Sequence, residues 1–158
     1  MRLHLNIKEQ QLTLIEPDQT IRFSVSTAAN GVGEQSGSGC TPRGSHIIRA
    51  KIGDGLPVNA VFVGRRFTGE IYSPELALAH PSRDWILTRI IWLSGCERGL
   101  NRLGNVDSMR RYIYIHGTPE TEPMGVPASH GCIRMRNKDL LTVFQRVPVG
   151  TSLLIEEC

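Results

Sequence analysis

Residues 129–155 read SHGCIRMRNKDLLTVFQRVPVGTSLLI, and they predict a short reactive cluster followed by a helix and a final strand. Leu140, Phe144 and Val147 recur at helical spacing, so one face of the segment KDLLTVFQRV is apolar. Asn137 stands at the position of a helix cap. The turn PVGT then ends the helix, and SLLIEE predicts a closing strand.

Alternating apolar and polar residues dominate the first quarter of the chain and predict a sheet. LHLNI and LTLI, joined by KEQQ, have the pattern of a hairpin, and TIRFSVST predicts a third strand. SHIIRAKI, AVFVGRRF, WILTRIIWL and RRYIYI each predict one further strand. A helical turn is expected in YSPELALAHPSRD before Pro81 ends it. We therefore expect a mostly β fold with one principal helix.

Three loops separate these elements. Residues 28–44 are rich in Gly and Ser without an apolar period, residues 94–105 are spaced by glycines, and residues 117–128 hold three prolines. Loops as long as the first are often functional. No linker, repeat or low-complexity tract divides the chain, so residues 1–158 are predicted to form a single domain.

Composition excludes some classes of partner. The chain has 18 Lys and Arg against 15 Asp and Glu, scattered rather than clustered, so we expect no nucleic-acid binding. Its most apolar run, WILTRIIWL, is short and broken by Arg89, so no membrane span is predicted. The start, MRLHLNIKEQQLTLIE, lacks the apolar segment of a secretion signal. We expect a cytoplasmic protein, or a periplasmic one if the native start has been removed.

The cysteines fit a reducing compartment. There are four, and if Cys132 works as a thiolate the remaining three cannot all pair within one chain. No C-x-x-C pair is present, so the sequence suggests neither a redox motif nor a thiolate zinc site.

Two motifs suggest nucleophilic catalysis. YIYIHGT, residues 112–118, predicts a strand that ends in His116, and SHGC presents a thiol after a second loop. A cysteine attacks as the thiolate, which requires a partner that lowers its pKa, and His116 and His130 are the available imidazoles. Two alternatives remain at this stage. Cys132 can be a buried inert thiol, or the three side chains can ligate zinc.

IHGT, the following loop and SHGCIRMRNKDLLTVFQRVPVGTSLLI resemble the signature of the YkuD-type L,D-transpeptidases, bacterial enzymes of the peptidoglycan cell wall. FSVSTAANG and GCTPRGSHIIRAKIG also resemble segments of that family, so the likeness covers nearly the whole chain. Only residues 56–107 match weakly, and no function transfers to them. The resemblance implies a β-sandwich or partly barrelled sheet.

The resemblance also implies roles for the residues of the signature. Cys132 would be the nucleophile and His116 its general base and later acid, with the carbonyl of Gly117 orienting the imidazole. His130 and Gly131 would shape the oxyanion hole, with the Cys132 amide as a donor.

Two further residues have competing interpretations. Ser129 would hold the turn, or it merely satisfies nearby backbone amides. Arg134 would bind a substrate carboxylate through its bidentate fork, or it is a solvated charge beside a helix start. Some members of the family carry Asn at the position of Arg134, so the sequence leaves both interpretations open.

The substrate implied by the resemblance is a peptidoglycan stem tetrapeptide. Attack at the third residue, typically meso-diaminopimelate, would expel the terminal D-Ala and leave a thioester, which an amine or water then resolves. The resemblance implies no cofactor, and acylation of Cys132 by carbapenems. We also expect no metal and a monomer. The alternatives are a catalytically inactive wall-binding module and a zinc-binding protein.

Overall fold

The computed structural model describes all residues from Met1 to Cys158, and its ten strands form one sheet. The strands are β1 (Arg2–Asn6), β2 (Gln11–Ile15), β3 (Thr20–Ser26), β4 (Gly44–Ile52), β5 (Ala60–Val63), β6 (Arg66–Ile71), β7 (Ile86–Gly95), β8 (Tyr114–Gly117), β9 (Ile133–Met135) and β10 (Ser152–Glu156). The helices are α1 (Pro74–Ala79), α2 (Asn137–Arg146) and a short 3-10 turn, η1 (Gly104–Val106).

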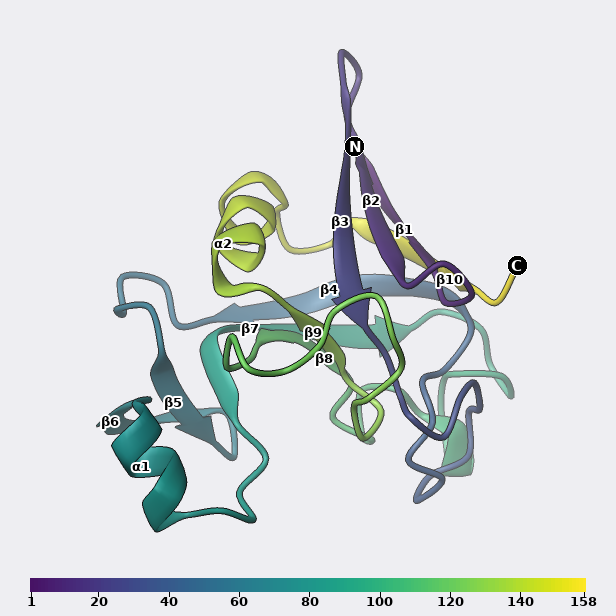
Figure 1. Cartoon of the computed structure of the whole chain (residues 1–158). Helices are drawn as coiled ribbons and strands as arrows, with labels where there is room; N and C mark the ends of the chain where they lie inside the picture. Colours follow the sequence, from purple (N-terminus) through teal and green to yellow (C-terminus); the bar gives the residue numbers. More distant parts are fainter.

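The sheet curls into a partly closed barrel. Its strands follow the order β4-β10-β1-β2-β3-β9-β8-β7, and an antiparallel pairing of β4 with β7 joins the two ends of that series. The β1–β10 and β8–β9 pairs are parallel. Hairpin β5–β6 extends the sheet beyond β7 and lies with α1 on one side of the molecule, at the lower left of Figure 1. The prediction of a mostly β, partly barrelled fold with one principal helix is confirmed.

Apolar side chains from alternate strand positions fill the barrel. Leu5, Leu12, Ile91 and Leu153 are members of one buried cluster to which most strands of the barrel contribute. This alternation follows from the period of two in a strand, which sends every second side chain inward. Burial of this apolar surface is the main source of stability for such a fold.

Helix α2 packs its apolar face against this core and contacts β7 and β8. The residues predicted for that face, Leu140, Phe144 and Val147, are all buried, so this part of the sequence analysis is confirmed. Helix α2 thereby packs against β8 and follows directly after β9, the two strands that bear the candidate site (Figure 1).

Two strand predictions differ from the structure. AVFVGRRF is a hairpin rather than one strand, because Gly64 and Arg65 both adopt positive φ (56° and 64°) and turn the chain between β5 and β6. Glycine enters that region without strain, and the chain reverses there. In RRYIYI only Tyr114 and Ile115 are in a strand, because Tyr112, at φ 57°, belongs to a turn that precedes β8.

The prediction that Asn137 caps α2 is wrong. Arg136 occupies the cap position and makes no side-chain cap hydrogen bond. Asn137 is instead the first helical residue, and its buried amide bonds to Thr88, Asn59 and the Thr118 carbonyl. Its hydrogen-bonding groups therefore link elements far apart in sequence and are not available for the helix end. No helix of the structure has the length and apolar character needed to cross a membrane.

Candidate active site

The candidate residues lie on the outer face of β8 and β9. These strands are parallel neighbours, with Ile115 opposite Ile133 and His116 opposite Arg134. Ile115 and Ile133 belong to the barrel core, so the alternating positions of the same strands face outward. Cys132, directly before β9, is therefore on the same face as His116 and is its diagonal neighbour in the register. In the structure no hydrogen bond joins the two side chains.

The imidazole of His116 is held by the adjacent backbone. Its Nδ1 lies 2.7 Å from the Gly117 carbonyl oxygen, and the residue is 1% exposed. A carbonyl only accepts, so Nδ1 carries the proton and Nε2 keeps a lone pair. Burial lowers the pKa of His116, so the resting ring is neutral near pH 7. The structure thus supplies a neutral base with a defined tautomer.

Gly117 is at a point where the chain has no room for a side chain. A Cβ there would lie 2.6 Å from the Leu87 carbonyl oxygen and would also meet the side chain of Asn137. Asn137 accepts a hydrogen bond from Thr88 Oγ1 at 2.7 Å. This close packing keeps in place the carbonyl that orients His116.

Cys132 is half-buried, and its sulfur contacts the backbone of β8 and of the turn that precedes β8. Sγ donates to the Tyr112 carbonyl at 3.3 Å and accepts from the Tyr114 amide at 3.4 Å. Burial raises the pKa of the Cys132 thiol to about 11, outweighing the opposite effects of the Tyr114 amide, Arg134 and Arg111. This differs from the lowered pKa expected for a standing thiolate. At neutral pH the two groups are therefore a neutral thiol and a neutral imidazole, so a reaction through the thiolate would first have to remove the thiol proton.

Ser129, His130 and Gly131 form the turn that delivers Cys132. Ser129 Oγ donates to the Cys132 carbonyl and accepts from the Gly131 amide at 3.2 Å. Gly131 has φ 128°, which a residue with a Cβ rarely adopts, and a Cβ would lie 3.3 Å from the Cys40 carbonyl oxygen. His130 is exposed and lines two cavities, one on the side of Cys132 and one on the side of Arg134.

Thr41 is a residue of this site to which sequence analysis assigned no role. Its Oγ1 donates to the Gly131 carbonyl at 2.9 Å and accepts from the Ala28 amide at 3.0 Å. In a trans peptide the N–H points away from the C=O, so the Cys132 amide is directed away from Thr41. That amide has no acceptor in the structure, which leaves it available to an oxyanion. The segment TPRG, which resembles the family, was the available signal.

Arg134 is nearly buried and its guanidinium is already paired. It donates to Asp84 at 3.1 Å, to Glu122 at 3.3 Å and to the Ala128 carbonyl at 3.3 Å. A cavity of about 220 Å³ adjoins it. The expected role in binding a substrate carboxylate stays a prediction, and such a carboxylate would have to compete with two resident ones.

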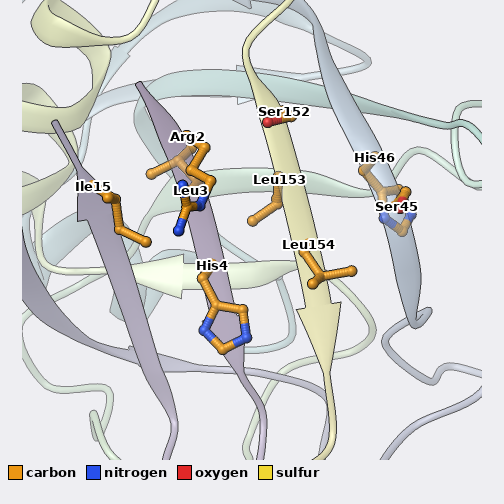
Figure 2. Close-up of a pocket in the computed structure, with 9 residues that line it drawn as sticks. All are labelled: Arg2, Leu3, His4, Ile15, Ser45, His46, Ser152, Leu153 and Leu154. Carbon is orange, nitrogen blue, oxygen red and sulfur yellow. The ribbon is translucent and has the colours of Figure 1, made fainter. Parts of the chain in front are cut away.

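A separate cavity of about 450 Å³ lies over β1, β2, β4 and β10. Figure 2 shows Arg2, His4, Ser152 and Leu154 among the side chains around it. His4 pairs with Glu156 at 2.7 Å, and no cysteine lines this cavity. This cavity is therefore separate from the candidate residues around Cys132. Nowhere in the structure do three or more His, Cys, Asp or Glu side chains cluster so as to hold a metal ion.

Comparison with known proteins identifies the family of the fold and site. The family model of YkuD, the L,D-transpeptidase catalytic domain, matches residues 1–155. The chain belongs to this family. The assignment made from the signature residues is confirmed, and the barrel with its outward-facing strand pair is a YkuD domain.

Curated relatives of this YkuD domain match over a short stretch. The probable L,D-transpeptidase YbiS of Escherichia coli K12 is 49% identical over 41 residues, which are 26% of this chain and 13% of that protein. The putative L,D-transpeptidase YqjB of Bacillus subtilis is 49% identical over 43 residues, or 27% of this chain and 24% of that protein.

Solved structures share the fold over nearly the whole chain. An L,D-transpeptidase from Mycobacterium smegmatis is 16% identical with a TM-score of 0.56, and the match covers 98% of this chain and 57% of that one. L,D-transpeptidase 3 from Mycobacterium tuberculosis, with a faropenem-derived adduct, is 15% identical with a TM-score of 0.57, covering 98% and 59%. The YkuD domain therefore spans less than two thirds of these relatives.

Proposed function

We propose that this YkuD domain is a cysteine acyltransferase that cleaves the L,D bond before the terminal D-Ala of peptidoglycan stem tetrapeptides. The observation that carries the proposal is the outward-facing pair of His116 and Cys132. His116 has its tautomer fixed by the Gly117 carbonyl at 2.7 Å, and Cys132 has a free amide. A base, a nucleophile and an oxyanion donor are the parts that acyl transfer requires.

In the first half-reaction His116 Nε2 takes the proton of the Cys132 thiol as sulfur attacks the carbonyl of the third residue. General-base assistance at this step removes the need for a standing thiolate, which burial disfavours. The oxyanion of the tetrahedral intermediate accepts a hydrogen bond from the Cys132 amide. The protonated imidazole then gives its proton to the D-Ala nitrogen, the C–N bond breaks and a thioester remains.

In the second half-reaction an amine of another stem peptide or a water molecule attacks the thioester. His116 removes a proton from this acceptor, and the thiolate leaves and is reprotonated. An amine gives a cross-link, and water gives trimming of the tetrapeptide. We hold hydrolysis in the cytoplasm as the more specific hypothesis, tested by fractionation of the native source together with the product assay. Protein in the periplasm, or cross-linked dimers exceeding tripeptide, would contradict it.

Carbapenems are proposed to acylate Cys132 by the same attack on a carbonyl. One related L,D-transpeptidase has been solved in complex with imipenem, and another as an avibactam carbamoyl enzyme. Intact-protein mass spectrometry after incubation with imipenem tests this directly. A mass increase that Cys132→Ala abolishes supports it, and an unreactive protein contradicts it.

The decisive experiment incubates the protein with a purified muropeptide tetrapeptide, alone and with an acceptor amine, and identifies the products by mass spectrometry. Loss of D-Ala, dependent on Cys132, supports the proposal. Cys96→Ala is the matched control, because Cys96 is an exposed thiol outside the site. Binding of muropeptide without turnover would indicate an inactive wall-binding module, and stoichiometric metal with an unreactive thiol would indicate a zinc protein.

A further inference from the structure

A cavity of about 440 Å³ opens beside Cys132 on the side away from Arg134. Cys132 and His130 line one part of it, Arg110 and Arg111 line another, and the glycine-rich segment 36–39 contributes backbone. No Asp or Glu is among its lining residues. The nucleophile therefore adjoins a cavity with two arginines and no acidic side chain.

Arg111 is a half-buried cation that forms no ion pair within hydrogen-bonding distance. Its guanidinium donates to the carbonyl oxygens of Gly33 at 3.2 Å, Glu34 at 3.2 Å and Cys40 at 2.7 Å. The Glu34 carboxylate pairs with Arg43 at 3.0 Å instead. Burial lowers the pKa of Arg111, and the Glu34 carboxylate, which makes no hydrogen bond to it, opposes this effect only in part. An anion bound directly to the guanidinium would favour its charged form further.

Arg110 places a second guanidinium at the same cavity. The residue is exposed, its side chain makes no ion pair or hydrogen bond in the structure, and only its backbone amide is engaged, with Asp107. Its fork of donors is free to bind a planar anion. Arg111 is engaged by hydrogen bonds to the backbone of residues 33–40, whereas the guanidinium of Arg110 is available to a ligand.

The opposite cavity has a different charge balance. There Arg134 is compensated by Asp84 and Glu122 at 3.1 and 3.3 Å. An arriving carboxylate would meet the two carboxylates that are hydrogen-bonded to Arg134 on that side. The cavity of Arg110 and Arg111 has no carboxylate in its lining, although Asp107 and Glu34 interact electrostatically with these arginines from outside it. Geometry and charge both favour the Arg110 side for an anion.

We infer that the cavity beside Cys132 binds a free carboxylate of the peptide substrate, and that Arg110 is the residue that distinguishes this carboxylate from an amide. The inference rests on the proposed function and adds its substrate class: peptides with an unamidated carboxylate near the scissile bond. A carboxylate accepts two charge-assisted hydrogen bonds from a guanidinium fork, and a neutral amide cannot. The carboxylate belongs either to the side chain of the third residue or to the terminal D-Ala.

The test compares three synthetic tetrapeptides: unmodified, amidated on the side chain of the third residue, and amidated at the C-terminus. The kcat/KM of each is measured for the wild-type protein, for Arg110→Gln and for the control Arg102→Gln. Arg102 is also exposed and lies on the same connecting segment but lines another cavity. We expect Arg110→Gln to lower kcat/KM for the unmodified peptide about tenfold, because one charge-assisted hydrogen-bonded contact is lost.

If amidation removes the carboxylate that Arg110 binds, Arg110→Gln should no longer lower kcat/KM for that peptide. The peptide that shows no loss therefore identifies which carboxylate occupies the cavity, because the double-mutant comparison isolates the pairwise contact. Equal losses for all three peptides, no loss, or the same loss in Arg102→Gln would overturn the inference while leaving the proposed function in place. No turnover of any peptide by the wild-type protein would overturn the proposed function as well.

A second measurement needs no turnover. Cys132 is alkylated with anionic iodoacetate and with neutral iodoacetamide, and the ratio of the two rates is compared between proteins. A cationic cavity raises this ratio, so we expect Arg110→Gln to lower it about twofold or more and Arg102→Gln to leave it unchanged. An unaltered ratio in Arg110→Gln would contradict a role for this side chain near the thiol.

Discussion

The two faces of β8 and β9 have opposite uses, although they are built from alternating residues of the same short strands. Inward, Ile115 and Ile133 are fully buried in the barrel core. Outward, His116 and Cys132 form the candidate reactive pair. A one-residue shift of either strand would exchange the two sets. The comparison indicates that inward residues of these strands stabilise the fold, whereas outward residues carry the proposed reactivity. Mutations on each face test whether stability and activity can be changed independently.

The largest expected effect belongs to the outward face. Cys132→Ala should reduce tetrapeptide turnover by about 10⁴-fold or more, because no covalent thioester can form. The melting temperature should stay close to that of the wild-type protein, since the side chain is small and half-buried. Steady-state kinetics and thermal denaturation measure both quantities. Activity surviving near the wild-type level would end the nucleophile hypothesis, and Cys40→Ala and Cys158→Ala serve as further controls.

The inward face should show the reverse. Ile133→Ala removes a fully buried side chain and should lower the free energy of unfolding by about 2–5 kcal/mol. Turnover per folded molecule, measured well below the melting temperature, should change little by comparison. Chemical denaturation gives the stability. If kcat instead falls as far as in Cys132→Ala, inward residues also determine activity, and the proposed division between the two faces is wrong.

His116→Gln should slow acylation about a hundredfold, because the proton of a thiol with a pKa of about 11 then has no neutral base to receive it. Single-turnover acylation by imipenem measures this step without the acceptor. His130→Gln is the matched control, since His130 is exposed and no hydrogen bond fixes its ring. A larger loss in the control than in His116→Gln would transfer the role of base to His130.

Arg134→Lys sharpens the comparison, because this outward residue is held by two carboxylates. Lys cannot keep both contacts, so the free energy of unfolding should fall by about 1 kcal/mol, a small figure because both acids are partly solvated. The KM should change less than about twofold if the Arg110 side binds the substrate carboxylate. A clearly raised KM with an unchanged melting temperature would restore Arg134 as the substrate ligand.

The smallest effect concerns pH. Burial lowers the pKa of both His116 and His46, and His46 is held by Ser108 at 2.8 Å. A folded-state pKa below the unfolded value means that stability is lost as pH falls below about 6.5. Melting temperatures between about pH 5 and pH 8 should show this, and His46→Gln should flatten the acid side of the curve. A pH-independent melting temperature would contradict the assigned cause.

Burial shifts the pKa of Cys132 in the opposite direction to that of the two histidines. Its pKa is raised to about 11, so its contribution to stability is complete at neutral pH and is lost as pH rises from about 9 toward 11. Cys132→Ala should remove this alkaline part of the pH dependence. A curve unchanged by the substitution would mean that other groups cause the alkaline loss.

Local patterns in the sequence predicted most of the strands and the apolar face of α2, because alternation and helical spacing are properties of neighbouring residues. The candidate site residues came instead from the resemblance of their motifs to the YkuD family. What the local patterns missed depends on distant partners. The β4–β7 pairing that closes the barrel joins His46 to Gly95. The carboxylates that neutralise Arg134 come from loops before β7 and after β8, and Thr41 reaches Gly131 across the glycine-rich loop. A hydrogen bond between segments that are far apart in sequence produces no recurring pattern among neighbouring residues, so it cannot be predicted from such a pattern.

The pairing of β1 with β10 has a consequence for biosynthesis. Leu3 lies beside Leu153 in a parallel register, so the second edge of β1 stays uncovered until β10, which is translated much later, is available to pair with it. Until then β1 has only the β2 hairpin, and β4 lacks the neighbour that separates it from β1. Such long-range pairings slow folding and leave strand edges open to other chains. Closure of the barrel is therefore an event that follows translation of residues 152–156.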